Sequence, residues 1–459
     1  MTEAGNNYSE KKTQLHISVR NLVEFIFREG DIDNRSSRAM SADAMMEGTR
    51  IHRKIQGSMG KEYQAEVPLS LVVEGDLYEL TVEGRADGIF TEDGKCFVDE
   101  IKGMYRRVEL FEKPVFVHRA QAMCYAYIFA LQNNMETIGI QMTYCNLETE
   151  QTKYFREEFS FEEIKKWFDD LMEEYGKWAT FQCEMKNQRQ ASIKELDFPF
   201  EYRPGQKKLV SDVYRTIMRQ KLLFMQAPTG VGKTISTIFP AVKAVGEELA
   251  DRIFYLTAKT ITATVAKETF ALLEKNGYRA KTIQITAKEK LCPCDEMECN
   301  PVTCPYAKGH FDRVNDAVFD LLHRCEMIER DDILSQADRY TVCPFELCLD
   351  TASWCDNIIC DYNYVFDPNV YLKRFFQEGI KGDYIFLIDE AHNMVERSRQ
   401  MYSAQIYKED FLTVKRIMKE HSRSIEKALE KCNKILLGMK RECENYTVYD
   451  TFGNMVFSY

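Results

Sequence analysis

One short glycine-rich segment constrains the fold of this chain more than any other feature. It reads Ala227-Pro228-Thr229-Gly230-Val231-Gly232-Lys233-Thr234. An apolar run over residues 222–225 precedes it, and a helix-compatible segment follows it. Between a buried strand and a helix N-terminus, such glycines let backbone N–H groups close around phosphate oxygens, while Lys233 neutralises the outer phosphates and Thr234 reaches Mg²⁺. The segment therefore predicts a phosphate-binding loop for ATP or GTP in an α/β fold.

A second segment supplies the other half of such a site. Residues 384–388 form a continuous apolar run that is followed by Asp389-Glu390-Ala391-His392. Such a run is typical of a strand that is buried on both faces of a parallel sheet. The end of this strand would bring Asp389 to the Mg²⁺ and Glu390 to the attacking water. An Asp-Glu pair alone would be weak evidence, but together with the loop it indicates a nucleotide hydrolase.

The loop and the Asp-Glu-Ala-His box together resemble those of superfamily 2 helicases. The loop begins with Ala227 where the general pattern has glycine, and this variant is common in helicases. The resemblance implies that Asp389 binds the metal, that Glu390 polarises water and that His392 couples hydrolysis to nucleic acid. Residues 202–206 resemble the adenine-contacting element of these enzymes, with Gln206 as the base reader. Residues 255–260 look like the strand-end element that touches the DNA backbone.

Length, charge and hydropathy bound the remaining possibilities. A chain of 459 residues suggests about three domains. We find no apolar run of about 18 residues that could cross a bilayer, and the N-terminus lacks the apolar stretch of a secretory signal, so we expect a cytoplasmic protein. The formal net charge of −11 argues against indiscriminate adhesion to nucleic acid. Any DNA contact must therefore come from local basic surfaces, such as residues 203–208.

Cysteines are concentrated in one part of the chain. Nine of the fifteen lie between Cys292 and Cys360. In a cytosolic protein such clustering indicates metal binding before disulfides. Four thiolates can hold either Zn²⁺ or an iron–sulfur cluster, although the paired Cys-x-x-Cys knuckles of zinc ribbons are missing here. Residue types alone leave both metals open.

The position of these cysteines, between the phosphate loop and the Asp-Glu-Ala-His box, resembles the XPD/DinG family, whose insertion holds a [4Fe–4S] cluster. This resemblance implies four ligands: Cys292, Cys299, Cys304 and Cys343. Cys294 is an alternative for the first or second place. We interpret the remaining cysteines of the region as buried single residues: Cys325, Cys348, Cys355 and Cys360.

The N-terminal part contains a second constellation of polar residues. A helix capped by Ser18 is predicted as far as residue 27, and a helix over residues 42–56 contains His52. Strands are predicted over residues 66–73 and 77–82, and they lead to Asp87. On the strand over residues 96–103, Glu100 and Lys102 share one face because they are two residues apart.

Two carboxylates and an imidazole beside a lysine can form a site for Mg²⁺ or Mn²⁺ that hydrolyses phosphodiesters. Spacing alone favours an ordinary surface hairpin. However, Gln121 and Tyr125 follow on one face of a helix, and the complete ordered set resembles RecB-type nucleases of the PD-(D/E)XK class. By this resemblance the metal ligands are His52, Asp87 and Glu100, Lys102 positions the water, and Gln121 and Tyr125 contact the DNA strand.

The chain therefore divides into a PD-(D/E)XK nuclease-like α/β domain and a RecA-like parallel-sheet lobe. The expected ranges are 1–185 for the nuclease domain, 186–198 for a linker, 199–286 and 346–400 for the lobe, 287–345 for the iron–sulfur insertion, and 401–459 for the start of a helical arch. No segment resembles the second RecA lobe with its charge-stabilising arginine. We therefore expect a fragment of a longer protein.

The function expected from these resemblances is that of an ATP-dependent DNA helicase of XPD/DinG type, fused to a metal-dependent DNA nuclease, in repair or recombination. Its expected cofactors are ATP, Mg²⁺, a [4Fe–4S] cluster, and Mg²⁺ or Mn²⁺ in the nuclease site. Its expected partner is single-stranded or junction DNA. One alternative is a module that binds ATP and DNA and uses the nuclease fold only as a clamp. Another is a zinc-stabilised ATPase that acts on RNA.

Overall fold

The computed structural model describes residues 12–35, 42–60, 62–228, 230–258, 260–377 and 379–447. It divides the chain into two compact units. The first comprises residues 1–361 and 372–390, and the second comprises residues 362–371 and 391–459. No helix in the described ranges is both long enough and apolar enough to span a membrane.

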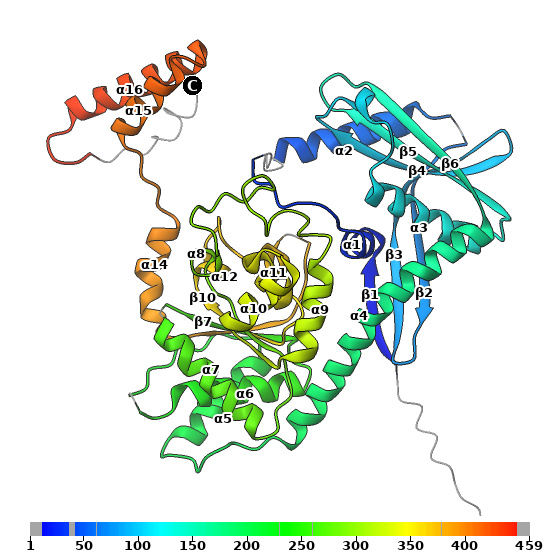
Figure 1. Cartoon of the computed structure of the whole chain (residues 1–459). Helices are drawn as coiled ribbons and strands as arrows, with labels where there is room; N and C mark the ends of the chain where they lie inside the picture. Colours follow the sequence, from blue (N-terminus) through cyan, green and yellow to red (C-terminus); the bar gives the residue numbers. More distant parts are fainter. Residues whose placement is uncertain are drawn as a thin grey trace, which may run out of the picture. The chain divides into compact units, whose positions relative to one another are not determined.

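The N-terminal domain of the first unit is built on a mixed six-stranded sheet (Figure 1). Its strands are β1 (Thr13–Ser18), β2 (Gln64–Glu74), β3 (Tyr78–Glu92), β4 (Lys95–Met104), β5 (Thr137–Asn146) and β6 (Thr152–Ser160). They follow the order β1-β3-β4-β5-β6, with β2 also paired to β3. The pairs β1–β3 and β4–β5 are parallel, whereas β2–β3, β3–β4 and β5–β6 are antiparallel.

Three helices and one 3₁₀ turn accompany this sheet: α1 (Val19–Ile26), α2 (Ala42–Ser58), α3 (Phe116–Gln132) and η1 (Val108–Leu110). Helices α1 and α2 confirm the two helices predicted for this part of the chain. The Ser18 side chain accepts a hydrogen bond from the N–H of Asn21 at the start of α1. Helix α3 is buried along most of its length because it packs against β4 and β5 on one side and against the next helix on the other.

That next helix, α4 (Phe161–Glu195), continues from the N-terminal domain into the lobe. Its first half buries Phe168 in the N-terminal core, and near its end Ile193 lies in the core of the lobe. Between them Arg189 forms an ion pair with Asp356 of the lobe. The predicted linker over residues 186–198 is therefore wrong as far as Glu195. This polar stretch is helical because one face of the helix packs against the lobe.

The lobe is built on a five-stranded parallel sheet in the order β11-β7-β10-β8-β9. Its strands are β7 (Arg252–Thr257), β8 (Thr282–Gln284), β9 (Met327–Ile328), β10 (Asn357–Asp361) and β11 (Tyr384–Ile388). The helices of the lobe are α5 (Gln206–Met218), α6 (Lys233–Gly246), α7 (Thr260–Lys275), α8 (Lys288–Leu291), α9 (Val314–Arg324), α10 (Arg330–Tyr340), α11 (Pro344–Ala352) and α13 (Lys373–Phe376). This mixed α/β lobe with a parallel sheet has the RecA-like character that the sequence predicted.

The second unit is helical. It contains α12 (Asn363–Phe366), η2 (Ala391–Asn393), α14 (Met394–Met401), α15 (Lys408–Met418) and α16 (Arg423–Glu442). Helices α15 and α16 pack against each other as a hairpin. Ser422 caps α16 by accepting the N–H of Ile425, which fixes the turn between the two helices.

Two expectations about strands are wrong. Residues 222–225 form no strand, and Leu222 is 89 % exposed. Strand β11 is not buried on both faces either, because Phe386 and Ile388 are 40 % and 38 % exposed. Strand β11 is an edge strand of the described sheet, and its burial alternates along the chain, so only one of its faces is covered. Residues 222–225 do not pair with it in the described sheet.

Candidate functional site

The phosphate loop leads directly into α6, which begins at Lys233. Gly230 and Gly232 have φ angles of +83° and +76°, a backbone conformation that favours glycine. Lys233 Nζ lies 3.6 Å from Glu390 Oε1. The structure therefore brings together the lysine of the loop and the glutamate of the Asp-Glu-Ala-His box, as expected for one nucleotide site.

Asp389 lies at the end of β11, where its backbone N–H donates to the carbonyl of Leu256 on β7 over 2.9 Å. Burial raises the pKa of the Asp389 carboxyl, and the adjacent charge of Glu390 raises it further. Two neighbouring carboxylates of this kind are costly to ionise together unless a cation sits beside them. The end of β11 is therefore a suitable place for Mg²⁺.

Gln206 lies against the phosphate loop rather than in open solvent. Its Oε1 accepts the backbone N–H of Arg203 over 3.0 Å, and its Nε2 donates to the carbonyl of Val231 over 3.2 Å. The guanidinium of Arg203 donates to the carbonyl of Gly230. A Cβ on Gly232 would come within 2.7 Å of the Gln206 amide, so glycine is needed there for close packing as well as for its φ. The predicted adenine-contacting element thus touches the loop.

The remaining predicted residues of this site lie in the loop, in the first turns of helices or outside the described part of the chain. Thr229 and Lys259 lie outside the described residues, and the side chain of Thr260 is not described. Ala227 and Pro228 form the irregular start of the loop, and Thr234 is half-buried in the first turn of α6. His392 belongs to η2 in the second unit, whereas Glu390 closes the first unit.

The predicted residues of the N-terminal constellation lie on neighbouring elements and make pairwise contacts. His52 on α2 and Asp87 on β3 approach to 3.5 Å between Nδ1 and Oδ1. The other Asp87 oxygen accepts the N–H of Ile101 over 2.7 Å, which fixes the carboxylate against β4. On β4, Lys102 Nζ lies 2.6 Å from Glu100 Oε1. Four elements thus deliver the predicted residues to one place, since α3 adds Gln121, whose Oε1 lies 3.4 Å from Lys102 Nζ.

Glu100 dominates the electrostatics of this place. Its side chain is fully buried, and its Oε2 has no hydrogen-bond partner. Burial raises the pKa of Glu100 to about 8, and the charge of Asp87 adds to the shift while Lys102 opposes it. A divalent cation would satisfy the unpartnered oxygen and favour the ionised carboxylate. The donor set therefore fits Mg²⁺ or Mn²⁺, which prefer carboxylate oxygens.

Tyr125 does not lie where its expected contact with DNA requires. It is 3 % exposed, and a Cβ on Gly84 would come within 2.5 Å of its hydroxyl oxygen. The ring therefore packs against Gly84 of β3 and is not exposed for contact with a DNA strand. Gln121, one helical turn earlier, reaches the site through Lys102 instead.

Sequence reasoning missed Gln56, which stands one turn after His52 on α2. Its Nε2 donates to the carbonyl of Asp87 over 2.9 Å and to Glu66 Oε1 over 3.0 Å. Glu66 has a φ of +57° and faces Asp87 where the β2–β3 ladder is interrupted between the pairs Ala65–Gly88 and Val67–Ala86. The i, i+4 spacing from His52 was a signal for Gln56.

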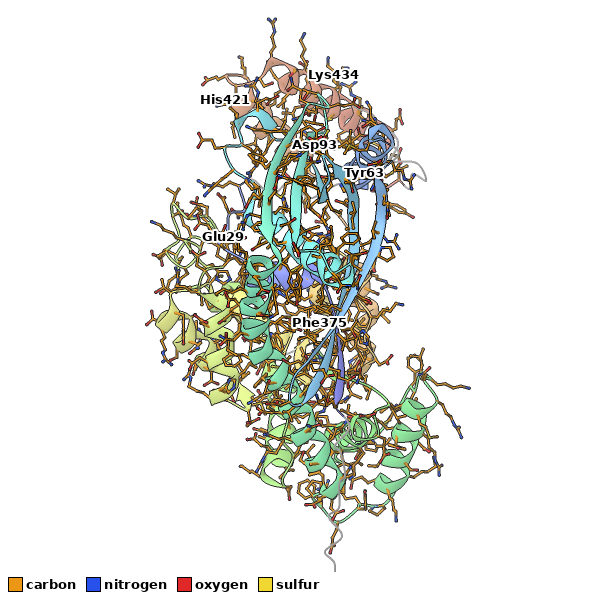
Figure 2. The ribbon with its side chains drawn as sticks, turned by 90° about the vertical axis from the view of Figure 1, so that its right-hand side faces the viewer. Glu29, Tyr63, Asp93, Phe375, His421 and Lys434 are labelled. Atoms are coloured by element: carbon orange, nitrogen blue, oxygen red, sulfur yellow. The ribbon has the colours of Figure 1, made fainter. Side chains whose placement is uncertain are left out.

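Asp99 precedes Glu100 and points to the opposite face of β4. It accepts hydrogen bonds from the Tyr63 hydroxyl over 3.1 Å and from the Thr143 hydroxyl over 2.6 Å. Figure 2 shows Tyr63 beside the strands of the N-terminal sheet. Burial raises the pKa of Asp99, and these donors compensate the buried carboxyl. Asp99 therefore has a structural role beneath the site.

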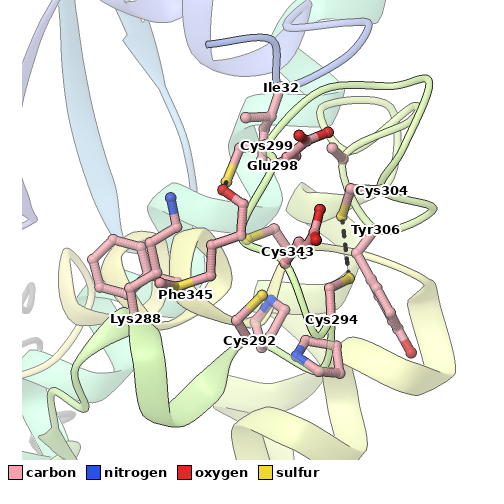
Figure 3. A pocket seen from close by; sticks show the side chains of 15 residues that line it. Ile32, Lys288, Cys292, Cys294, Glu298, Cys299, Cys304, Tyr306, Cys343 and Phe345 are labelled. Atoms are coloured by element: carbon pink, nitrogen blue, oxygen red, sulfur yellow. Dashed lines mark hydrogen bonds between the residues drawn. The ribbon is translucent and has the colours of Figure 1, made fainter. Parts of the chain in front are cut away.

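Five cysteines line one cavity of the insertion (Figure 3): Cys292, Cys294, Cys299, Cys304 and Cys343. The Sγ atoms of Cys294 and Cys304 are 3.9 Å apart. Burial raises the pKa of Cys294 to about 12 and that of Cys343 to about 11. All four predicted ligands thus share the cavity, together with the alternative.

The surroundings of the cavity hold its cysteines in place. The backbone N–H of Cys343 donates to Nδ1 of the fully buried His310 over 3.1 Å. The side chain of Asn300 accepts the N–H groups of Val302 and Thr303 and so closes the turn before Cys304. Cys348, Cys355 and Cys360 are buried elsewhere, as predicted, whereas Cys325 is only partly buried.

The chemistry of the cavity, several thiols in a loop with little secondary structure, fits an iron–sulfur cluster or zinc. In the described ranges, no group of three or more His, Cys, Asp or Glu side chains stands at metal-binding spacing. The thiols therefore share a cavity without converging on one point. The carboxylates and the imidazole of the N-terminal site likewise make pairwise contacts without forming a group of three at metal-binding spacing in the described residues.

Comparison with known proteins adds independent information. The DEAD_2 family model matches residues 271–411. The chain is 20 % identical over 248 residues to Regulator of telomere elongation helicase 1 of Rattus norvegicus, which covers 43 % of this chain and 19 % of the relative. It is 23 % identical over 232 residues to General transcription and DNA repair factor IIH helicase subunit XPD/RAD3 of Saccharomyces cerevisiae (strain ATCC 204508 / S288c), which covers 43 % of this chain and 29 % of the relative.

Among solved structures, the chain is similar to one described as Truncated XPD, with 16 % identity and a TM-score of 0.35. That similarity covers 53 % of this chain and 71 % of the solved one. The chain thus spans less than a third of the length of the two curated relatives.

Proposed function

We propose, from the premise that this chain is related to XPD-type superfamily 2 helicases, that it is an ATP-dependent DNA helicase acting in DNA repair or recombination. The observation that carries this proposal is the approach of Lys233 to Glu390 beside Asp389. Helicases of this kind act on DNA, which is the proposed partner, in single-stranded or junction form. The family likeness and the site geometry support the same conclusion independently.

The residues of the lobe have distinct roles in hydrolysis. Lys233 neutralises the outer phosphates of ATP, and the glycine-rich backbone holds them at the start of α6. Thr234 and Asp389 would hold Mg²⁺, which neutralises charge that develops on the phosphates. Glu390 orients the attacking water. In the described arrangement Glu390 faces Lys233 directly, so we propose that bound ATP separates these two side chains.

Replacing Glu390 with Gln tests the hydrolytic role. The variant keeps the shape of the side chain but loses the carboxylate that polarises water, so we expect ATP hydrolysis to fall by about 10²-fold or more. Binding of Mg–ATP should remain near the wild-type level, because Glu390 does not hold the phosphates. Steady-state phosphate release and ATP titration measure the two quantities. Equal turnover in wild type and variant would contradict the assigned role.

A second function, DNA cleavage, is favoured by the N-terminal site. We propose that His52, Asp87 and Glu100 hold Mg²⁺ or Mn²⁺, as in RecB-type nucleases, and that Lys102 positions the water. The bound metal would lower the pKa of that water. Arg106 and Arg107 are exposed shortly after Lys102, on the loop that follows β4, where they can meet a phosphate backbone. The unpartnered Glu100 oxygen supports this function over that of an inert clamp.

The cavity in the insertion supports a third assignment. We propose that Cys292, Cys299, Cys304 and Cys343 hold a [4Fe–4S] cluster, which would organise a loop that contains little helix or strand. Cys294 competes for a place because its thiol faces Cys304. Zinc on the same thiols is the alternative outcome.

Serine replacements separate these possibilities. Anaerobically prepared protein should contain about four irons per chain, and Cys304→Ser should lose them because serine is a poor iron ligand. Cys325→Ser is the matched control, since Cys325 lies outside the cavity, and it should keep the iron. Iron content and visible absorbance measure the result. Stoichiometric zinc in place of iron would overturn the cluster, and loss of iron in Cys294→Ser but not in Cys299→Ser would exchange these two ligands.

A further inference from the structure

Residues 28–35, which follow α1, cross the cysteine-rich insertion. We call residues 28–35 the strap. Its backbone forms hydrogen bonds along the insertion in two regions. Phe311 N–H donates to Gly30 O (3.0 Å), Ile32 N–H donates to Ala307 O (2.9 Å), and Asn34 N–H donates to Cys299 O (2.9 Å). The strap is thus joined to the insertion by backbone hydrogen bonds, although it follows α1 of the N-terminal domain.

Side chains strengthen the same contact. Gly30 N–H donates to Asp312 Oδ1 over 2.7 Å, and Gly309 N–H donates to Asp31 Oδ1 over 2.6 Å. Each side therefore contributes one carboxylate to the backbone of the other. Hydrogen bonds to charged acceptors are stronger than neutral ones, so these two contacts hold the strap in register.

A buried ion pair anchors the beginning of the strap. Arg28 Nη1 lies 2.8 Å from Asp350 Oδ2, and Arg28 Nε donates to Asn315 Oδ1 over 2.7 Å. Asn315 in turn donates to the carbonyl of Phe25 on α1. Arg28 and Asp350 are both largely buried, and Arg374 shares the aspartate. Loss of Asp350 would leave the buried Arg28 guanidinium without its ion-pair partner, so this contact fixes the strap at its beginning.

The strap reaches the cysteine cavity itself. Ile32 is one of the residues that line the cavity, and Figure 3 shows its side chain on the same side as Cys299. It comes from the N-terminal domain, whereas the cysteines come from the insertion. Asn34, two residues later, holds the backbone of Cys299 through its N–H group.

We propose that the strap is the outer wall of the cluster site. Ile32 excludes water from the cavity, and the N–H of Asn34 positions the Cys299 segment. This inference rests on the proposed [4Fe–4S] assignment. The stability and potential of such clusters depend on solvent exposure and on the hydrogen bonds around their ligands. The N-terminal domain is therefore a structural part of the cluster site, and the cluster decays faster when the strap is loosened.

Variants of the full chain test this wall. Ile32→Ala removes apolar cover, and Asn34→Pro removes the N–H that holds Cys299. Asn34→Ala is the matched control because it keeps the N–H. Ile26→Ala, at the end of α1 within the N-terminal domain, controls for a general loss of stability. Each protein is loaded anaerobically, its iron content is measured, and the decay of cluster absorbance is followed after exposure to air.

We expect Ile32→Ala and Asn34→Pro to lose absorbance several-fold faster than wild type, with Asn34→Ala and Ile26→Ala close to wild type. Circular dichroism verifies that all variants are folded. If wild type contains iron but Ile32→Ala and Asn34→Pro lose absorbance at the wild-type rate, the proposal that the strap protects the cluster is wrong, while the cluster assignment stands. Wild-type protein that takes up no iron would overturn the cluster assignment, and the wall with it.

Discussion

Lys102→Ala is expected to reduce metal-dependent cleavage of DNA by the full chain by about 10²-fold or more. Lys102 Nζ is 2.6 Å from the buried Glu100 and close to Gln121, so its ammonium group lies among the proposed ligands without being one of them. Its loss removes the group that positions water, while the carboxylates and His52 remain. Binding of Mn²⁺ should therefore persist in the variant, and cleavage of single-stranded DNA without ATP should be lost.

Two further variants make this result specific. Lys95→Ala removes a lysine from the other end of β4, where it pairs with Glu158 at the surface, and should cut at the wild-type rate. Asp87→Ala should lose the metal as well as cleavage, because it removes a proposed ligand. Calorimetry with Mn²⁺ and gel assays of cleavage measure both properties. Absence of Mn²⁺ binding in wild type, or wild-type cleavage by Lys102→Ala, would favour an inert clamp.

The N-terminal site shows how much of a polar constellation can be foreseen from local patterns. Glu100 and Lys102 share a face because alternate residues of a strand point the same way, and β4 confirms this. Their approach to Asp87 follows from the antiparallel pairing of β3 with β4. Gln56 could have been found from its i, i+4 spacing to His52. Glu66 could not, because its role depends on an interruption of the β2–β3 ladder that no residue pattern predicts.

The limits of such predictions are clearest where one part of the chain covers another. The stretch over residues 186–198 is polar, and it was predicted as a linker because a helix with one contacting face and a solvated linker have similar compositions. Ile193 and Arg189 become informative only when the lobe is in place. Residues 222–225 show the reverse case. Their apolar character predicts a strand, but a strand forms only when it pairs with another strand of the sheet, and residue character alone does not determine that pairing.

The cysteine cavity illustrates a third limit. Clustering and position indicated a metal site, and the cavity gathers all the candidate thiols. Spacing could not choose between Cys294 and Cys299, because both lie in irregular backbone close to the other ligands. The strap could not be foreseen at all, since its backbone hydrogen bonds and its ion pair join segments that are far apart in the sequence.

The continuity of α4 and the strap has a consequence for experiments. The N-terminal domain and the lobe belong to the same compact unit. Aromatic rings meet where they join, and the ring centroids of Trp178 on α4 and Trp354 of the lobe are 4.6 Å apart. A fragment that ends near residue 185 would remove the last third of α4, together with Trp354 and the rest of the lobe, and would expose Trp178. Activities of the N-terminal site are therefore best measured in the full chain.

Lys233→Ala is expected to have an effect of similar size on nucleotide binding. Lys233 is the first residue of α6 and faces Glu390 across the proposed phosphate site. Its ammonium contributes charge-assisted hydrogen bonds to the phosphates, which are worth about 3 kcal/mol, or about 100-fold in Kd. The matched control is Lys275→Ala, since Lys275 lies exposed in the last turn of α7 and should not affect ATP.

Titration of Mg–ATP into wild type, Lys233→Ala and Lys275→Ala tests the central claim, that this lobe is the ATP-binding motor of a helicase. We predict that wild type and Lys275→Ala bind with the same Kd and that Lys233→Ala binds about 100-fold more weakly. Equal affinity of wild type and Lys233→Ala, or no binding by wild type, would contradict the claim.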